Sequence, residues 1–315
     1  MPKPLVSIII PTYNRADIIS NAVCSALQQT YSNKEIIVVD DGSTDNTCER
    51  LRVFGDNIRL VRQVNAGPSA ARNAGVKASM GQILTFLDSD DLWLHSKIAK
   101  QVKMLQSVDE SVPCCLCNAL ILRNSGKKVT SFDLAPIRAR IEKGLWLNVT
   151  SILSTRCVLF TQAAAVRRSV FEKVGGFDES LRIMEDHDMA LRLSLEGPWA
   201  FLREPLVIYH YGIEDGLAEE ARHNDLQICK SIERIVANML ADRRVPETGA
   251  KKYFARSHTK MWRHIERSQG WSKARRISVL MDKSFEAVMQ VCDFAFRHSP
   301  MYPKMEVTAF GGQNR

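Results

Sequence analysis

The sequence predicts an α/β fold, with a mostly parallel central sheet flanked by helices and a helical C-terminal extension. In the first third of the chain, continuous apolar segments alternate with amphipathic ones, which is typical of a parallel sheet covered on both faces. Acidic residues come directly after two of the apolar segments, at the edge of the sheet where such folds bind ligands. After Tyr211 the strand-like segments stop, and the remaining periodic segments are helical.

The elements expected in the first third are short and alternate between strand and helix. Strands are predicted over residues 5–10, 35–43, 58–63 and 82–91, and helices over 16–29, 67–79 and 95–107. Pro11 is expected to end the first strand. The helix at 67–79 opens with glycine and proline, as helices often do, and is rich in alanine.

From Cys114 the alternation becomes less regular. The next predicted elements are a strand over 114–122, loops with short elements over 124–155, a strand, a helix and a Gly-Gly turn over 162–181, a helix over 185–197, and a pair of strands around Pro205. Two helices are expected after Tyr211, over 225–240 and 275–297, and the second carries an apolar stripe.

The composition is that of a globular protein with an excess of basic residues. The chain has 315 residues, of which 45% are hydrophobic and 25% charged, and its net charge is +8. No segment resembles a secretory signal or reaches the roughly 20 apolar residues of a membrane span. The eight cysteines form neither a disulfide framework nor a complete zinc site, so we expect buried thiols in a cytoplasmic protein. The positive charge is concentrated in residues 251–276, where Glu266 is the only acid.

Carboxylates crowd at the ends of two predicted strands. Asp40 and Asp41 come after one strand, while Asp88, Asp90 and Asp91 come after another. Acids this close repel one another unless a cation or a positive side chain offsets their charge. The sequence has neither a P-loop nor a dinucleotide-binding glycine motif. We therefore expect Mg²⁺ or Mn²⁺ to bridge these carboxylates and the phosphates of a ligand, although an isolated D-x-D can also be a loop or a helix cap.

Five segments resemble, in order and spacing, those of family 2 glycosyltransferases, which have the Rossmann-like GT-A fold. They are VSIIIPTYNR, EIIVVDDGSTDNT, NAGPSAARNAG, ILTFLDSDDLW and GGFDESLRIMEDHDMALRL, within roughly residues 4–210. The resemblance implies inverting transfer of a sugar from a nucleoside-diphosphate sugar with Mn²⁺ or Mg²⁺. The expected donor is a UDP-sugar. The expected acceptor is a hydroxyl of a growing cell-surface glycan or of a lipid-linked molecule.

The same resemblance implies roles for residues near the first two strands. Pro11 and Tyr13 would line the pocket of the nucleotide base. Asp41 would accept a hydrogen bond from the base, with Asp40 as the less favoured candidate. Arg72 would reach the base or the diphosphate. The alternative for Arg72 is an ordinary surface position on its helix.

The resemblance also assigns the acids of the DSDD segment. Asp88 would lie near the ribose and the metal, and Asp90 would ligate the metal, whereas Asp91 is expected to cap the next helix. Many relatives place a metal- or diphosphate-binding histidine after the last strands. Here Gly212 takes that position and His210 lies two residues earlier, so the role of His210 stays open, with a structural or acceptor-side role as the alternative to metal or diphosphate binding.

An inverting transfer needs a base that deprotonates the acceptor hydroxyl. Family members place this base at the aspartate of an E-D pair, which is Asp186 here, with Glu185 as the alternative. Asp186 precedes Met189 and Leu193 by three and seven residues, so it should face the sheet with them, while Glu185 and Asp188 should project to other sides. The plain alternative is an acidic helix start that suits the helix dipole.

The expected organisation is a catalytic domain over 1–215, with a nucleotide-binding half (1–105) and an acceptor-side half (106–215), and a helical extension over 216–315. The extension is basic and partly apolar, which suits an anionic membrane surface at the inner face of the membrane, or else packing on protein or self-association. No nucleic acid is expected as a partner, because no recognition motif occurs. The alternatives are a catalytically idle protein that binds nucleotide sugars, a nucleic-acid binder and a sugar nucleotidyltransferase.

Overall fold

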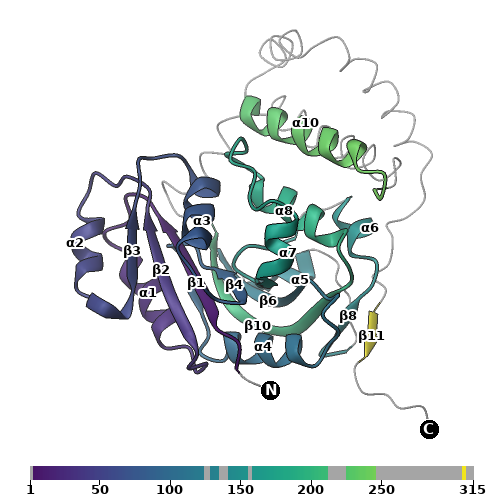
Figure 1. Cartoon of the computed structure of the whole chain (residues 1–315), viewed down its shortest axis with the longest axis horizontal. Helices are drawn as coiled ribbons and strands as arrows, with labels where there is room; N and C mark the ends of the chain where they lie inside the picture. Colours follow the sequence, from purple (N-terminus) through teal and green to yellow (C-terminus); the bar gives the residue numbers. More distant parts are fainter. Residues whose placement is uncertain are drawn as a thin grey trace.

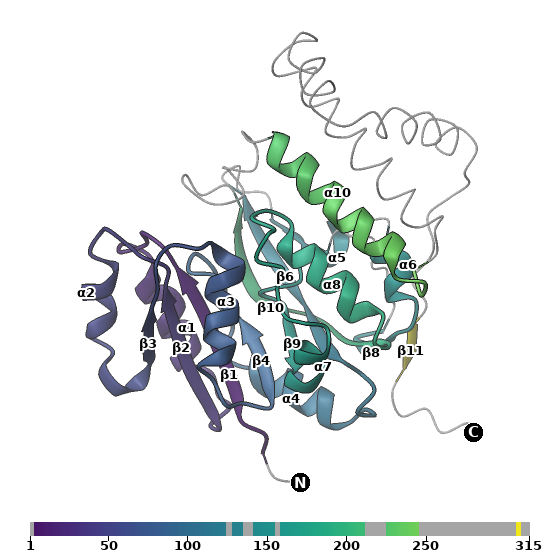
Figure 2. The same cartoon turned by 45° about the horizontal axis from the view of Figure 1, so that its top comes forward.

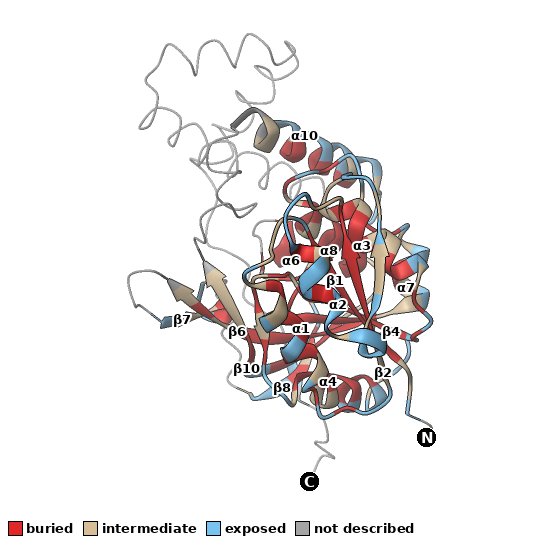
Figure 3. Ribbon diagram, turned by 90° about the vertical axis from the view of Figure 1, so that its left-hand side faces the viewer, coloured by how far each residue is buried: buried red, intermediate tan, exposed pale blue. Residues whose placement is uncertain are grey.

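The computed structural model describes residues 3–123, 128–134, 141–154, 158–211, 225–245 and 307–309. Within these ranges the strands form one continuous sheet, and helices cover both of its faces (Figure 1). The buried apolar residues lie between the sheet and the helices (Figure 3). The α/β architecture expected from the sequence is therefore confirmed.

The first part of the chain contributes four parallel strands. They are β1 (Val6–Thr12), β2 (Lys34–Asp40), β3 (Arg59–Arg62) and β4 (Ile83–Phe86), in the spatial order β3-β2-β1-β4. Pro11 does not end β1, which continues to Thr12 along β2. On its other side β1 pairs with β4 only up to Ile9, so the missing N–H of Pro11 interrupts no ladder there.

The second half extends the sheet beyond β4 with both parallel and antiparallel strands. The next strands in space are β9 (Ala164–Arg167), β6 (Cys114–Arg123), β10 (Trp199–Tyr211), β8 (Lys143–Trp146) and β11 (Val307–Ala309). Two short strands, β5 (Leu92–Trp93) and β7 (Lys128–Thr130), pair with β10 and β6. Of these pairs only β10 and β6 are parallel, so the sheet as a whole is mixed and its first half is purely parallel.

The expected pair of strands around Pro205 is wrong, because residues 199–211 form the single strand β10. Its register along β6 shifts on either side of Pro205, which cannot donate a ladder hydrogen bond. Residues before the shift pair with β8, and residues after it pair with β5. After the shift, β10 pairs with β5, the short strand that follows the DSDD segment, and this brings His210 into contact with Asp90 and Asp91.

Helices α1 (Ile19–Leu27) and α4 (Lys97–Gln106) lie on one face of the sheet, with α2 (Thr47–Arg52) beside α1, and α3 (Pro68–Lys77) lies on the opposite face (Figure 2). Helix α3 approaches β1 closely at Gly75, where a Cβ would collide with the side chain of Ile9. This close approach sets Arg72, one turn earlier on α3, over the end of the sheet that carries the acids.

On the same face as α3, α7 (Arg168–Lys173) and α8 (Glu185–Ser194) cover the second half of the sheet (Figure 2). Helix α10 (Asp225–Ala241) packs over α8, and its Ile232 and Ile235 are buried in the main apolar core. The short helices are α5 (Ser131–Leu134), α6 (Val149–Leu153) and the 3₁₀ helix η1 (Gly55–Asn57).

The predicted helix over 225–240 is confirmed as α10. The predicted helix over 275–297, the basic stretch over 251–276 and the boundary near residue 215 lie outside the described residues, so the division into domains stays a prediction. Among the described residues, no helix has the length and apolar character needed to cross a membrane.

Candidate active site

A tight turn after β4 presents the acids of the DSDD segment. The N–H of Asp91 donates to the carbonyl of Asp88 at 3.1 Å, which closes the turn. The carboxylate of Asp88 is held from two sides, by Arg72 Nη2 at 2.8 Å and by the side-chain amide of Gln162. Arg72 comes from α3 and Gln162 from the segment before β9, so both halves of the sheet fix this carboxylate.

Arg72 is the centre of the site, because it also binds the start of α8. Its Nη1 donates to Glu185 Oε1 at 2.7 Å, and its guanidinium lies 5.3 Å from the ring centroid of Phe177. Arg72 is only 3% exposed, so the surface-arginine alternative is wrong. Burial would lower the pKa of Arg72, but the charges of Asp88 and Glu185 raise it above its usual value. The arginine therefore stays charged and joins the acidic turn to α8.

The ionised forms of the other two acids of the turn, Asp90 and Asp91, are only partly stabilised by the protein. Burial and the charge of Asp88 raise the pKa of Asp90, and Arg15 and His210 oppose that rise. The pKa of Asp91 is raised well above its usual value by burial and by the charges of Asp90 and Asp88. Because crowded acids with raised pKa values favour a nearby cation, this turn is suited to bind one.

Asp91 does not cap α4, whose N-cap residue is Ser96, so that expectation is wrong. Asp91 is 1% exposed, and its Oδ1 accepts the backbone N–H of His210 at 3.0 Å. The Nδ1 of His210 lies 2.7 Å from the carbonyl of Asp90, and since a carbonyl only accepts, Nδ1 carries the hydrogen. His210, which belongs to β10, thus joins the acidic turn to that strand, in agreement with the structural role left open for it.

The described residues fit a divalent cation that is completed by phosphate oxygens. They contain no group of three or more His, Cys, Asp or Glu side chains that could hold a metal ion by itself. Mg²⁺ and Mn²⁺ are commonly bound by one or two carboxylates together with the phosphates of a substrate. Asp90, with Asp88 beside it, offers that donor set, whereas Asp88 is already engaged by Arg72 and Gln162.

The first turn of α8 carries the candidate base. Asp186 is half-buried, and its Oδ1 accepts the N–H of His187 at 2.7 Å. Burial and the charge of Glu185 raise the pKa of Asp186 to about 7, against the opposing charge of Arg72. Glu185, by contrast, is occupied by its ion pair with Arg72. Of the two acids, Asp186 is therefore the one available to take a proton.

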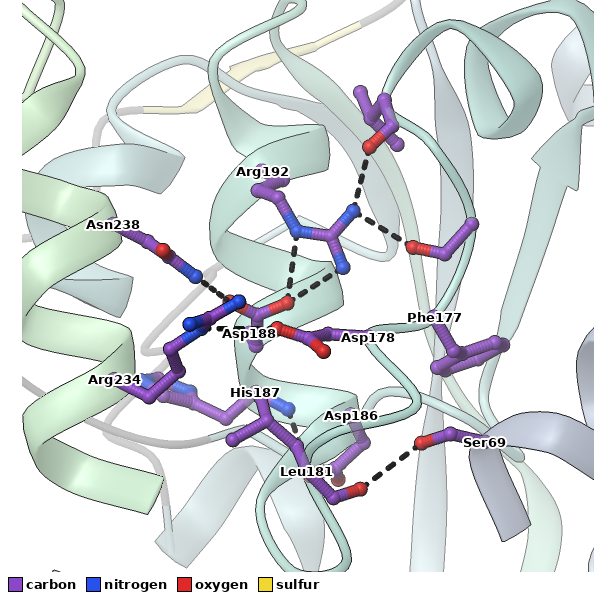
Figure 4. Close-up of polar contacts among 12 residues, drawn as sticks. Ser69, Phe177, Asp178, Leu181, Asp186, His187, Asp188, Arg192, Arg234 and Asn238 are labelled. Atoms are coloured by element: carbon purple, nitrogen blue, oxygen red, sulfur yellow. Dashed lines mark hydrogen bonds and ion pairs between the residues drawn. The ribbon is translucent and has the colours of Figure 1, made fainter. Parts of the chain in front are cut away.

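The prediction that Glu185 and Asp188 project away from the buried side of the helix is wrong, because α8 is buried on more than one side. Glu185 and Asp188 are 7% and 2% exposed, so neither projects into solvent. Glu185 turns towards Arg72, while Asp188 lies between Arg192 of the same helix and Asn238 of α10 (Figure 4). The cover that α10 provides on the outer face of α8 accounts for the burial of Asp188.

The acids after β2 hold loops in the first part of the chain. Both oxygens of Asp41 accept backbone N–H groups, from Ala66 at 2.9 Å and Gly67 at 2.8 Å, and Gln63 donates to Oδ1 at 2.7 Å. Asp41 thereby fixes the loop that leads into α3. The residue is 4% exposed, so a base bound here would have to share an oxygen with these donors.

Asp40 is completely buried and holds the turn after β2. It accepts hydrogen bonds from the backbone of Ser43 and from the side chains of Cys48 and Arg62. Burial alone would raise the pKa of Asp40, but these hydrogen bonds lower it. This environment leaves Asp40 as a structural acid.

At the end of β1, Pro11 is buried and Tyr13 is 44% exposed, so Tyr13 offers a ring face to a ligand.

Sequence reasoning missed Gln162, which contacts the acidic turn, and Trp93, which contacts Gln162. Gln162 binds Asp88, and its own carbonyl accepts the indole N–H of Trp93 at 3.1 Å. Trp93 lies two residues after the DSDD segment and could have been noticed as an aromatic residue beside it. Gln162 has no local signal, because its partner is 74 residues away in the sequence.

Comparison with known proteins identifies the family. The model of "Glycosyl transferase family 2" matches residues 7–175. An uncharacterized glycosyltransferase of Rickettsia felis is 30% identical over 227 residues, which cover 70% of this chain and 36% of the relative. The Escherichia coli enzyme WfgD, a UDP-Glc:alpha-D-GlcNAc-diphosphoundecaprenol beta-1,3-glucosyltransferase, is 44% identical over 107 residues, which cover 33% of this chain and 42% of WfgD.

Solved structures share the fold at low sequence identity. S. aureus TarS 1–349 in complex with UDP-GlcNAc superposes with a TM-score of 0.64 at 17% identity, covering 91% of this chain and 79% of that one. The mannosyltransferase PcManGT of Pyrobaculum calidifontis, in complex with GDP-Man and Mn²⁺, gives a TM-score of 0.59 at 18% identity, covering 94% and 86%. Since the family match spans more than half of the chain, the protein belongs to glycosyltransferase family 2 and has a GT-A-like fold.

Proposed function

We propose that this glycosyltransferase moves a sugar, with inversion, from a UDP-sugar to a hydroxyl of a lipid-linked or growing cell-surface glycan, assisted by Mn²⁺ or Mg²⁺. The observation that carries the proposal is the bridge made by Arg72. It binds Asp88 of the acidic turn and Glu185 of α8, and so places the candidate base beside the turn that would hold the donor.

Each residue of the site has a distinct role in this proposal. Asp88 would bind the ribose of the donor, and Asp90 would hold the cation near the diphosphate, where a bound Mn²⁺ or Mg²⁺ acts as a Lewis acid on the leaving group. Asp186, when ionised, would take the proton of the acceptor hydroxyl as that oxygen attacks the anomeric carbon from the opposite face. Glu185 and Arg72 would keep Asp186 in place relative to Asp88.

Two similarities support the choice of donor and acceptor. TarS is described in complex with UDP-GlcNAc, and the name of WfgD gives a UDP-Glc donor and a diphosphoundecaprenol-linked acceptor. Tyr13, exposed at the end of β1, is suited to stack on a nucleotide base. The inverting stereochemistry rests on the family resemblance.

Donor and metal can be tested together by thermal unfolding. UDP with MnCl₂ is expected to raise the melting temperature of the wild type more than GDP, CDP or dTDP does, and Asp90→Asn is expected to remove that rise and the transfer activity. Without ligands, Asp90→Asn should fold at least as well as the wild type. The substitution removes a carboxyl group whose ionised form is disfavoured by burial and by the charge of Asp88, as its raised pKa indicates.

Asp56→Asn is the matched control, since Asp56 is an exposed acid of η1 far from the turn. It should keep both the UDP-dependent stabilisation and the activity. Full activity of the wild type in excess chelator would remove the metal from the proposal. A larger stabilisation by another nucleoside diphosphate would replace UDP.

The C-terminal extension leads us to propose a peripheral position at an anionic membrane surface. Residues 251–276 are strongly basic, and each Lys or Arg near such a surface contributes about 1 kcal/mol of binding. The expected result is flotation with liposomes that contain an anionic lipid at low salt, and loss of flotation at high salt. Neutral liposomes are the control. No flotation at low salt would leave packing on protein or self-association as the role of this segment.

A further inference from the structure

Lys97, at the start of α4, is a completely buried lysine that the proposed chemistry does not use. Its Nζ lies 3.9 Å from the ring centroid of Trp93 and donates to Gln101 Oε1 at 2.8 Å. Its partners among the described residues are thus an aromatic face and an amide oxygen rather than a carboxylate. A buried ammonium is costly without a full counter-charge, so its presence here calls for an explanation.

The two partners of Lys97 donate hydrogen bonds to adjacent carbonyls of one segment. The indole N–H of Trp93 donates to the carbonyl of Gln162 at 3.1 Å. The side-chain amide of Gln101 donates to the carbonyl of Ala163 at 2.8 Å. Trp93 and Gln101 belong to different elements, β5 and α4, and Lys97 is the group that contacts both.

This segment leads directly to the acidic turn, because the side chain of Gln162 donates to Asp88 Oδ2. A cation above an indole, or hydrogen-bonded to an amide oxygen, draws electron density towards itself and strengthens the N–H groups of the same side chain as donors. The charge of Lys97 therefore strengthens these two hydrogen bonds to the carbonyls of residues 162 and 163. A neutral side chain of the same length would not do so. The carbonyl of Ala163 also accepts the backbone N–H of Cys117 at 3.0 Å.

We propose that Lys97 is a positioning residue for the donor site, which holds Gln162 through Trp93 and Gln101 and thereby keeps Asp88 in its binding geometry. The proposal rests on the proposed role of Asp88 in holding the donor. It assigns Lys97 no contact with the substrate. It also gives Trp93 and Gln101 a function beyond filling the core between α4 and the sheet.

The first test is a double-mutant cycle on UDP binding, measured by calorimetry with MnCl₂. Lys97→Met and Gln162→Met are each expected to weaken binding by about tenfold, since each loosens a hydrogen bond to a charged acceptor. The double variant should bind no more weakly than either single variant, because both changes act through the same contact. Wild-type affinity of Lys97→Met, or additive losses in the double variant, would overturn the proposal.

Lys100→Met is the matched control on the same helix. The side chain of Lys100 is 42% exposed, and its ion pair is with Glu204 rather than with residues 162 and 163. This variant should bind UDP like the wild type. The melting temperature of Lys97→Met is expected to change little, because loss of a buried charge offsets loss of its hydrogen bond. A stability defect with unchanged UDP affinity would show that Lys97 serves the core alone.

A second test does not depend on the donor. Hydrogen–deuterium exchange of peptides that cover residues 158–166 should be faster in Lys97→Met and in Trp93→Phe, which keeps a ring but lacks the N–H, and unchanged in Lys100→Met. Unchanged exchange in the first two variants would overturn the proposal. If the wild type bound no UDP, the proposed donor would be wrong, and the exchange result would still decide whether Lys97 fixes this segment.

Discussion

Asp186→Asn is expected to lower the rate of sugar transfer by a factor of about 10² or more, while UDP and Mn²⁺ bind nearly as in the wild type. Asparagine keeps the size of the side chain and its hydrogen bond to the N–H of His187, but it cannot take a proton. Turnover would be measured by release of the nucleoside diphosphate in the presence of acceptor, and binding by calorimetry.

Glu185→Gln is the matched variant one residue earlier. It removes one of the two carboxylate charges that Arg72 binds, so it should reduce stability and activity together, and its activity loss should be smaller than that of Asp186→Asn. If Asp186→Asn kept its turnover and Glu185→Gln lost it, the base would be Glu185.

The pH dependence of kcat/KM gives an independent check on Asp186. A base works in its ionised form, and the pKa of Asp186 is raised to about 7 by burial and by Glu185. Activity should therefore be complete above that pH and fall as the pH decreases through it, well above the range of an ordinary aspartate. An activity that stays constant down to about pH 5 would contradict the raised pKa or the assignment.

Arg72→Met is expected to have the largest effect on stability, lowering the free energy of unfolding by about 3 kcal/mol or more and abolishing transfer. The change leaves Asp88 and Glu185 without the guanidinium that both contact. Thermal and denaturant unfolding measure the loss of stability, and release of the nucleoside diphosphate measures the loss of transfer.

Arg203→Met is the control, because Arg203 forms an ion pair with Glu142 at 3.2 Å in which both side chains are exposed, 50% and 78%. Exposed pairs contribute about 0–1 kcal/mol, so this variant should remain close to the wild type. Equal losses in both variants would mean that the bridge made by Arg72 contributes no more than a surface pair.

Local patterns in the sequence were the most reliable guide to the fold. The first four strands and the helices α1 and α3 were predicted correctly, because buried parallel strands such as β1, β2 and β4 are continuous apolar runs. Helix α2, between β2 and β3, was not predicted. Asp88 and Asp90 were placed at the sheet edge because they come directly after such a run. The close approach of Gly75 to Ile9 could not be predicted, because a glycine occurs in a helix for several different reasons.

Contacts between distant segments could not be predicted. Arg72 and Glu185 are 113 residues apart, and only the folded sheet brings α3 and α8 together. Asp91 was expected as a helix cap because Asp often fills that role, but its partner is the backbone of β10, 119 residues later. Asp188 was expected to project away from the core because the cover of α8 by α10 is not visible in the pattern of one helix.

The pairing of β11 with β8 has a consequence for the order of folding. Val307 lies opposite Trp146, so the strands that meet here are roughly 160 residues apart in the chain. During synthesis the edge of β8 therefore stays open until residues 307–309 have left the ribosome. An open strand edge can pair with other chains, and the protein should be most prone to aggregation in that interval. The rest of the sheet, with the candidate site, is synthesised before β11 and can form without it.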